Sequence, residues 1–175
     1  MKLPNSFKLV ASLVAPHFVG FVGSKFAIVG ATVWYDVLTK PDLTPPLWVF
    51  GPVWSLLYTL MGIALYLVWK KDGEKRGVGL SIWLFGIQLG LNILWAFLFF
   101  FKQRPETSFI VICILFFITF LTIISFIRVS KKGAFLLVPF LLWLAFIGYL
   151  NYTVCKIQKE INKNLIVQIE KSILS

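Results

Sequence analysis

Residues 80–101 read LSIWLFGIQLGLNILWAFLFFF and contain no charged side chain. A helix that crosses the hydrocarbon core of a bilayer needs about 20 consecutive, mainly apolar residues. This stretch is long enough, and apolar enough, to meet that requirement. It therefore predicts a membrane-spanning helix.

Four further apolar stretches flank this one, separated by short turns rich in charge, Gly or Pro. Hydrophobic residues make up 59% of the chain and charged residues only 14%, which argues against an ordinary soluble enzyme, a disordered chain or a disulfide scaffold. The sequence predicts an all-α, multi-pass integral membrane protein, a five-transmembrane-helix bundle within residues 1–155. The expected spans are residues 7–28, 45–69, 80–101, 107–127 and 134–154. Thr44 is expected to cap the second span ahead of Pro45 and Pro46.

The C-terminal residues 156–175 have a different pattern. Apolar residues recur every four positions at Ile157, Ile161, Leu165, Ile169 and Ile173, which predicts an amphipathic tail that lies on the membrane or packs on a partner. A solvated tail is the alternative. The net charge of +10 is attributed to contacts with lipid headgroups rather than with nucleic acid.

Sequence motifs for catalysis or metal binding are missing. The chain has one histidine, so no histidine cluster can hold a metal, and no acidic residue lies within a predicted span. No cofactor is therefore required by the sequence. His17 has two interpretations, a structural hydrogen-bonding residue or an axial ligand of haem iron, and the first is the more common role of a lone histidine.

Aromatic and amide side chains share faces on three of the predicted spans. Asn and Gln are costly at membrane depth unless they form hydrogen bonds, so these faces should point inward. One interpretation is a cavity with flat aromatic walls that suits a large, flat, apolar molecule. The other is that the same groups only hold the helices together. The three faces are Phe50, Trp54 and Tyr58; Gln88, Asn92, Trp95 and Phe99; and Trp143, Ile147 and Asn151.

Two weaker motifs concern the lipid-facing surface. Gly86 and Gly90 form a G-x-x-x-G motif, which favours close helix contact in a homodimer or within the chain. Leu150, Tyr152 and Lys156 fit a pattern proposed for sterol contact, which also arises often by chance.

One block of sequence resembles a known family. It comprises Trp34-Tyr35, Lys40-Pro41 and residues 44–54, TPPLWVFGPVW. With later matches around Asn92 and Trp143, this block is similar to the signature of the TspO/MBR family, the tryptophan-rich sensory or translocator proteins. The resemblance implies five transmembrane helices, a homodimer, and a pocket for porphyrins such as protoporphyrin IX and haem. Sterols and benzodiazepine-type ligands are also implied.

The resemblance also implies a set of site residues. A TspO-like protein would act as a tetrapyrrole receptor, carrier or regulator. Two alternatives stay open: an enzyme that degrades protoporphyrin IX in light and oxygen through Trp54 and Trp143, and a structural membrane protein without a ligand. Because Leu43, Ala96 and Phe140 stand where the family often has Trp, Ser and Tyr, a less polar pocket is expected. The implied pocket comprises Tyr35, Trp54, Tyr58, Asn92, Trp95 and Trp143, with Ile147 beside it.

Overall fold

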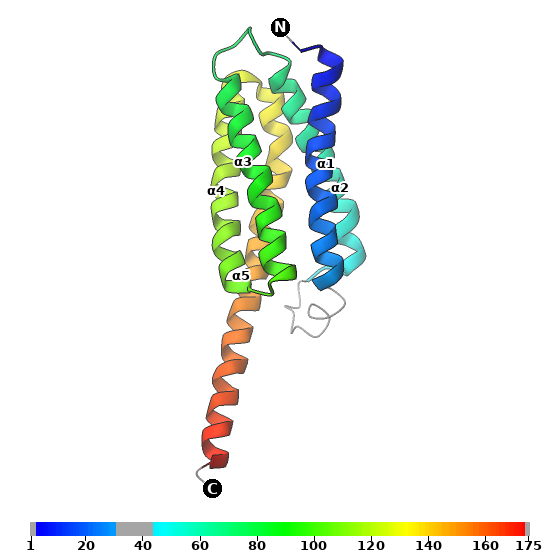
Figure 1. The fold of residues 1–175 in the computed structure, drawn as a ribbon. Helices are drawn as coiled ribbons and strands as arrows, with labels where there is room; N and C mark the ends of the chain where they lie inside the picture. The colour runs from blue at the N-terminus through cyan, green and yellow to red at the C-terminus, as the bar shows by residue number, and fades with distance from the viewer. Residues whose placement is uncertain (1–2, 31–43, 174–175) are drawn as a thin grey trace.

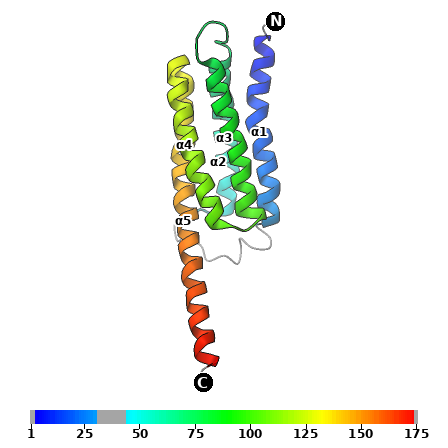
Figure 2. The same cartoon turned by 60° about the vertical axis from the view of Figure 1, so that its left-hand side comes forward.

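The computed structural model of the protein describes residues 3–30 and 44–173. Helices that follow one another in the chain run antiparallel and form an elongated bundle (Figures 1 and 2). After α3 the chain continues into a π-helical turn, η2. The elements are α1 (Asn5–Gly30), α2 (Leu47–Trp69), α3 (Val78–Ala96), η2 (Phe97–Phe101), α4 (Pro105–Val129) and α5 (Lys131–Ile173).

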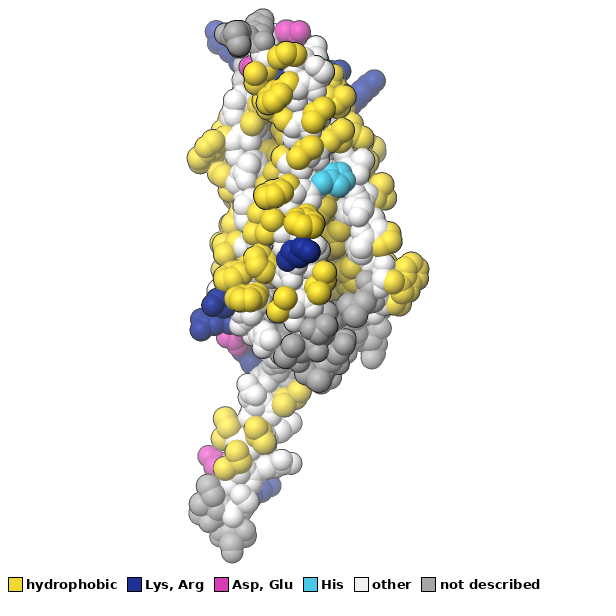
Figure 3. All heavy atoms as spheres, turned by 45° about the vertical axis from the view of Figure 1, so that its right-hand side comes forward, with side chains coloured by type: hydrophobic (Ala, Val, Ile, Leu, Met, Phe, Trp, Pro, Cys, Tyr) yellow, Lys and Arg dark blue, Asp and Glu magenta, His cyan; other side chains and the backbone are white. Residues whose placement is uncertain are grey.

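All five α-helices in the described part of the chain are long and apolar enough to cross a membrane. Large apolar side chains also cover the outside of the bundle, as Figure 3 shows for one face. Such a surface is suited to lipid tails and poorly suited to water. The prediction of a multi-pass, five-helix membrane protein is confirmed.

The start of α2 differs from the prediction. The helix begins at Leu47, and its N-cap is Pro46, with no side chain bonded to the cap. The prediction that Thr44 caps this helix is wrong, because Thr44 Oγ1 is buried without a hydrogen-bond partner among the described residues. The physical reason is that the helical conformation is disfavoured for a residue that precedes proline, so Pro45, which precedes Pro46, does not take the first helical position after Thr44.

The C-terminal tail continues the last span without a break. Helix α5 runs from Lys131 to Ile173, and its final turns project beyond the bundle (Figures 1 and 2). At the point of departure Lys159 Nζ lies 3.3 Å from Glu106 Oε1 of α4. The apolar positions Ile161, Leu165 and Ile169 are exposed, so the surface that they contact remains a prediction.

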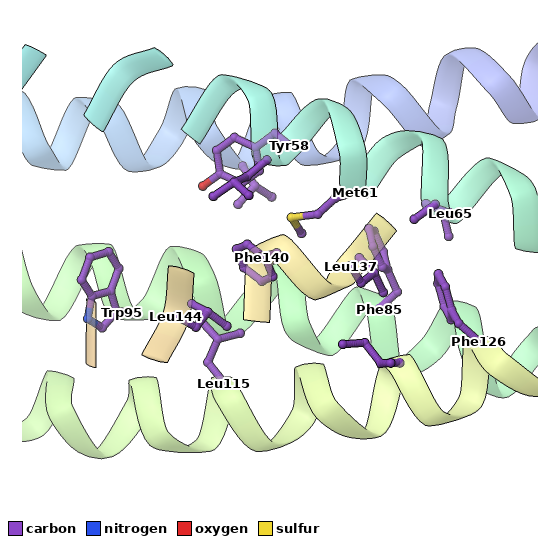
Figure 4. Packing of buried hydrophobic residues seen from close by; sticks show 14 of the residues in the cluster. Tyr58, Met61, Leu65, Phe85, Trp95, Leu115, Phe126, Leu137, Phe140 and Leu144 are labelled. Atoms are coloured by element: carbon purple, nitrogen blue, oxygen red, sulfur yellow. The ribbon is translucent and has the colours of Figure 1, made fainter. Parts of the chain in front are cut away.

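The core lies among α2, α3, α4 and α5. Met61, Phe126, Phe140 and Leu137 are fully buried, and Figure 4 shows these side chains meeting between the four helices. Helix α1 packs on the outside of this group, against α2 and α3. Its approach to α2 is close at Gly62, where an added Cβ would lie 2.9 Å from the Cα of Leu13 and from the carbonyl oxygen of Ser12.

Gly62→Ala should therefore destabilise the bundle. Backbone atoms of α1 cannot move away as a flexible side chain could, so the added methyl group should lower the free energy of unfolding by about 1–3 kcal/mol. Thermal unfolding in detergent measures this change. Gly79→Ala is the matched control, since a Cβ at Gly79 meets nothing within 4 Å; equal melting temperatures for the two variants would contradict the prediction.

Candidate functional site

Aromatic rings from three helices converge around Trp54 of α2. The Trp54 ring stacks on Tyr58 of the same helix at 5.4 Å and on Trp95 of α3 at 6.2 Å, with interplanar angles of 29° and 28°. Trp143 of α5 meets Trp54 nearly at right angles, with ring centroids 6.4 Å apart. The three indoles therefore come together. Trp54, Tyr58 and Trp95 form a continuous stack, called the aromatic wall below.

The aromatic wall borders a cavity of about 510 Å³ between α1, α2 and α3. The cavity lies in the half of the bundle where α1 ends and α2 begins, and its volume falls within the range of about 300–1,000 Å³ usual for small-molecule sites. Its lining residues are His17, Gly20, Phe21, Gly23, Ser24, Ala27, Ile28, Phe50, Gly51, Trp54, Ser55, Tyr58, Asn92, Trp95, Ala96 and Phe100.

Not every predicted pocket residue reaches the cavity. Trp143 lies behind the wall, against Trp54 and against Phe50 at 6.0 Å, and Ile147 is buried in the core. Tyr35 and Leu43 fall outside the described residues. A degradative role for Trp143 would therefore have to act through Trp54, and that role remains a prediction.

Asn151 of α5 holds Trp95 in place. Its Oδ1 accepts a hydrogen bond from Trp95 Nε1 at 3.2 Å and lies 3.0 Å from Ser108 Oγ, while its Nδ2 donates to the Pro105 carbonyl at 2.9 Å. One buried amide thus connects α3, the start of α4, and α5. The inward orientation expected for Asn151 is what the structure shows, and it serves to position the wall rather than to line the cavity.

Asn92 presents an unused hydrogen-bond donor at the cavity. Tyr58 Oη donates to Asn92 Oδ1 at 3.1 Å, which orients the amide, yet Asn92 Nδ2 has no partner among the described residues. A buried N–H group without a partner is unfavourable by about 1–3 kcal/mol. A ligand that brought a carbonyl or carboxylate oxygen to this point would remove that penalty.

Helix α1 lines one side of the cavity, and none of its residues was among the predicted pocket residues. Gly20 leaves room for the Tyr58 ring beside α1, because a Cβ there would overlap the ring. At the end of α1, Gly30 fits against η2, where a Cβ would lie 2.6 Å from the Phe100 carbonyl oxygen. The glycines of α1 were the available signal, whereas nothing in the Phe-rich run indicated that η2 would be a π-helical turn.

The residues around the aromatic wall are apolar. This agrees with the less polar pocket expected from Ala96 and Phe140. Ala96 lines the cavity and Phe140 packs edge-on against Trp54 at 6.2 Å. Gln88 points inward as expected but lies outside the cavity lining, fully buried, and neither of its amide atoms has a hydrogen-bond partner among the described residues.

The surface motifs lie away from the cavity. Gly86 and Gly90 are exposed on α3, and a Cβ at either would meet nothing within 4 Å, so they make no close helix contact within the described part of this chain. In the sterol pattern, Leu150 is buried while Tyr152 and Lys156 are exposed. These three residues therefore do not form one surface.

Asn151→Leu should disturb both the bundle and the wall. The substitution leaves Trp95 Nε1 without its partner, which should lower the free energy of unfolding by about 1–3 kcal/mol, whereas the Pro105 carbonyl keeps the hydrogen bond from Ser108 Oγ at 2.8 Å. It should also broaden or shift the emission spectrum of Trp95. Thr153→Val, on an exposed turn of the same helix where the hydroxyl bonds only to the Tyr149 carbonyl, should leave both properties unchanged; equal effects of the two variants would refute this role.

The fold and the cavity together define a class of protein: a small multi-pass membrane protein with an aromatic-lined cavity inside a helical bundle. The model of the TspO/MBR family matches residues 12–157, and the chain belongs to that family. It is 42% identical to the tryptophan-rich protein TspO of Chlorobaculum tepidum over 79% of this chain and 88% of that one. It is 40% identical to the translocator protein of Homo sapiens over 81% of this chain and 84% of that one.

Proposed function

We propose that this TspO-family protein binds a tetrapyrrole of the porphyrin class in the cavity between α1, α2 and α3, as a receptor, carrier or regulator. The observation that carries the proposal is the aromatic wall together with the unpartnered Asn92 Nδ2. Trp54 stacks within 30° of parallel on both Tyr58 and Trp95, and all three rings line the cavity, so they give it a largely aromatic surface. A conjugated macrocycle gains most from such a surface, because stacking and area burial both scale with its face.

The polar groups of the cavity support the same ligand class. Donors at the cavity are few. Among the described residues that line it, the buried donor without a partner is Asn92 Nδ2, which is suited to an oxygen at the edge of a flat molecule. A strongly polar ligand such as a sugar would leave most of its own groups unpaired here. A small aliphatic molecule would leave much of the wall uncovered.

Binding of protoporphyrin IX should quench the tryptophan fluorescence of the purified protein saturably. Trp54→Ala removes the centre of the wall and should weaken binding by about tenfold, corresponding to about 1.4 kcal/mol of lost stacking. Asn92→Leu should also weaken binding, because the ligand oxygen loses its donor. Titration of each variant in detergent gives the dissociation constants.

Trp83→Phe is the control for that titration. Trp83 is 68% exposed on the outer face of α3, so its loss should change the total fluorescence and leave the affinity unchanged. Non-saturable quenching, or the same affinity in Trp54→Ala as in the wild type, would show that the porphyrin binds elsewhere or only partitions into the detergent.

We further propose that Gly86 and Gly90 form the contact of a homodimer. Small residues at this spacing let two membrane helices approach closely, and both glycines face open space in this chain. Gly90→Leu should therefore fold normally and reduce the dimer fraction measured by light scattering in detergent. Gly79→Leu is the control, and a dimer fraction equal to that of the wild type in Gly90→Leu would place the contact elsewhere.

A further inference from the structure

The single histidine of the chain lies at the edge of the cavity. His17 lines it from α1, and Figure 3 shows the histidine at the surface of this face, among hydrophobic side chains. An imidazole is unfavourable at a lipid-facing position unless both of its nitrogens have a hydrogen-bond partner or a ligand. The two nitrogens of His17 are in different situations.

The Nδ1 atom of His17 is engaged with the helix. It lies 2.9 Å from the carbonyl oxygen of Leu13, one turn earlier. A carbonyl only accepts hydrogen bonds, so the proton of a neutral ring resides on Nδ1 and the lone pair on Nε2. Histidines that ligate metals typically show this arrangement, with the second ring nitrogen donating to a backbone carbonyl.

The Nε2 atom has only a weak competitor for its lone pair. Thr59 Oγ1 of α2 lies 3.3 Å from it. The single hydroxyl proton of Thr59 has a shorter bond available, to the Ser55 carbonyl at 2.9 Å. Nε2 is therefore an available Lewis base on a residue that lines the cavity, between α1 and α2.

We propose that His17 Nε2 is an axial ligand for the iron of a metalloporphyrin held in the cavity. This inference rests on the proposed porphyrin binding and specifies which form of the ligand the protein prefers, the iron complex over the metal-free macrocycle. An axial imidazole approaches a porphyrin with its ring steeply inclined to the macrocycle. The His17 ring stands at 56° to the ring of Tyr58, so a macrocycle parallel to the Tyr58 ring would meet the imidazole edge rather than its face.

The cavity residues fit such a ligand without further polar groups. The wall supplies stacking, Asn92 Nδ2 supplies a donor for an oxygen, and His17 supplies one nitrogen ligand, as haem proteins with a single proximal histidine do. A purely structural histidine would need only the bond to Leu13 and the contact with Thr59. The two roles differ in one testable respect, because only the ligand role distinguishes iron porphyrin from metal-free porphyrin.

The test compares two porphyrins on three forms of the full-length protein in detergent. Ferric haem and metal-free protoporphyrin IX are each titrated into the wild type, His17→Ala and Thr59→Val. The readouts are the dissociation constants, the position of the Soret band, and the spectrum of the reduced haem complex with carbon monoxide. Thr59→Val removes the neighbouring hydroxyl and leaves the imidazole in place.

His17→Ala should weaken haem binding by about tenfold or more. Its haem complex should also lose the Soret shift that an imidazole ligand produces. Metal-free protoporphyrin IX should bind the wild type and His17→Ala equally, added imidazole should restore the Soret shift in His17→Ala, and Thr59→Val should behave as the wild type.

Three outcomes would overturn the inference, and they are distinguishable. If His17→Ala binds both porphyrins with an unchanged haem spectrum and affinity, His17 is not an iron ligand, and the proposed function still stands. Equal loss of both porphyrins in His17→Ala assigns the residue to the architecture of the cavity. Failure of the wild type to bind either porphyrin defeats the proposed function, and this inference with it.

Discussion

The hydrogen bond from Trp95 Nε1 to Asn151 Oδ1 is the interaction on which the site depends. Inside a membrane, helices gain little from burying apolar surface against one another, since lipid tails are equally apolar. Close packing and buried hydrogen bonds therefore determine which helix faces meet. Asn151 joins α3, α4 and α5 in this way, and by fixing the Trp95 ring it gives Trp54 a surface to stack on.

The cavity forms where α1 packs against the bundle through glycines. These glycines lie opposite large residues of α2 and η2. Gly20 receives the Tyr58 ring and Gly30 receives the backbone of Phe100. Space remains between these contacts, bounded by flat rings and by few donors. The same peripheral position leaves His17 at the edge of the cavity, with one nitrogen bound to its own helix and the other turned toward α2.

Periodicity predicted the faces of the helices well and their depth poorly. Spacing placed Trp54 and Tyr58 on one face and Asn92 and Trp95 on another, and the structure brings both faces together. The same rule placed Trp143 on a third inward face that was expected to share the cavity, yet that ring lies against Trp54 and does not line the cavity. A 3.6-residue repeat states which way a side chain points, but not whether another ring stands between it and a cavity.

By itself, the sequence determined the five membrane helices, because the length and polarity of each apolar stretch leave a bilayer few other arrangements. It also determined that the amides point inward, since an unpaired amide in lipid is costly. Only the tertiary structure decided where the cavity lies, that α5 continues past the bundle, and that Asn92 Nδ2 has no hydrogen-bond partner in the part of the chain that the structure describes. Those properties depend on the distances between helices, and a one-dimensional pattern carries no information on such distances.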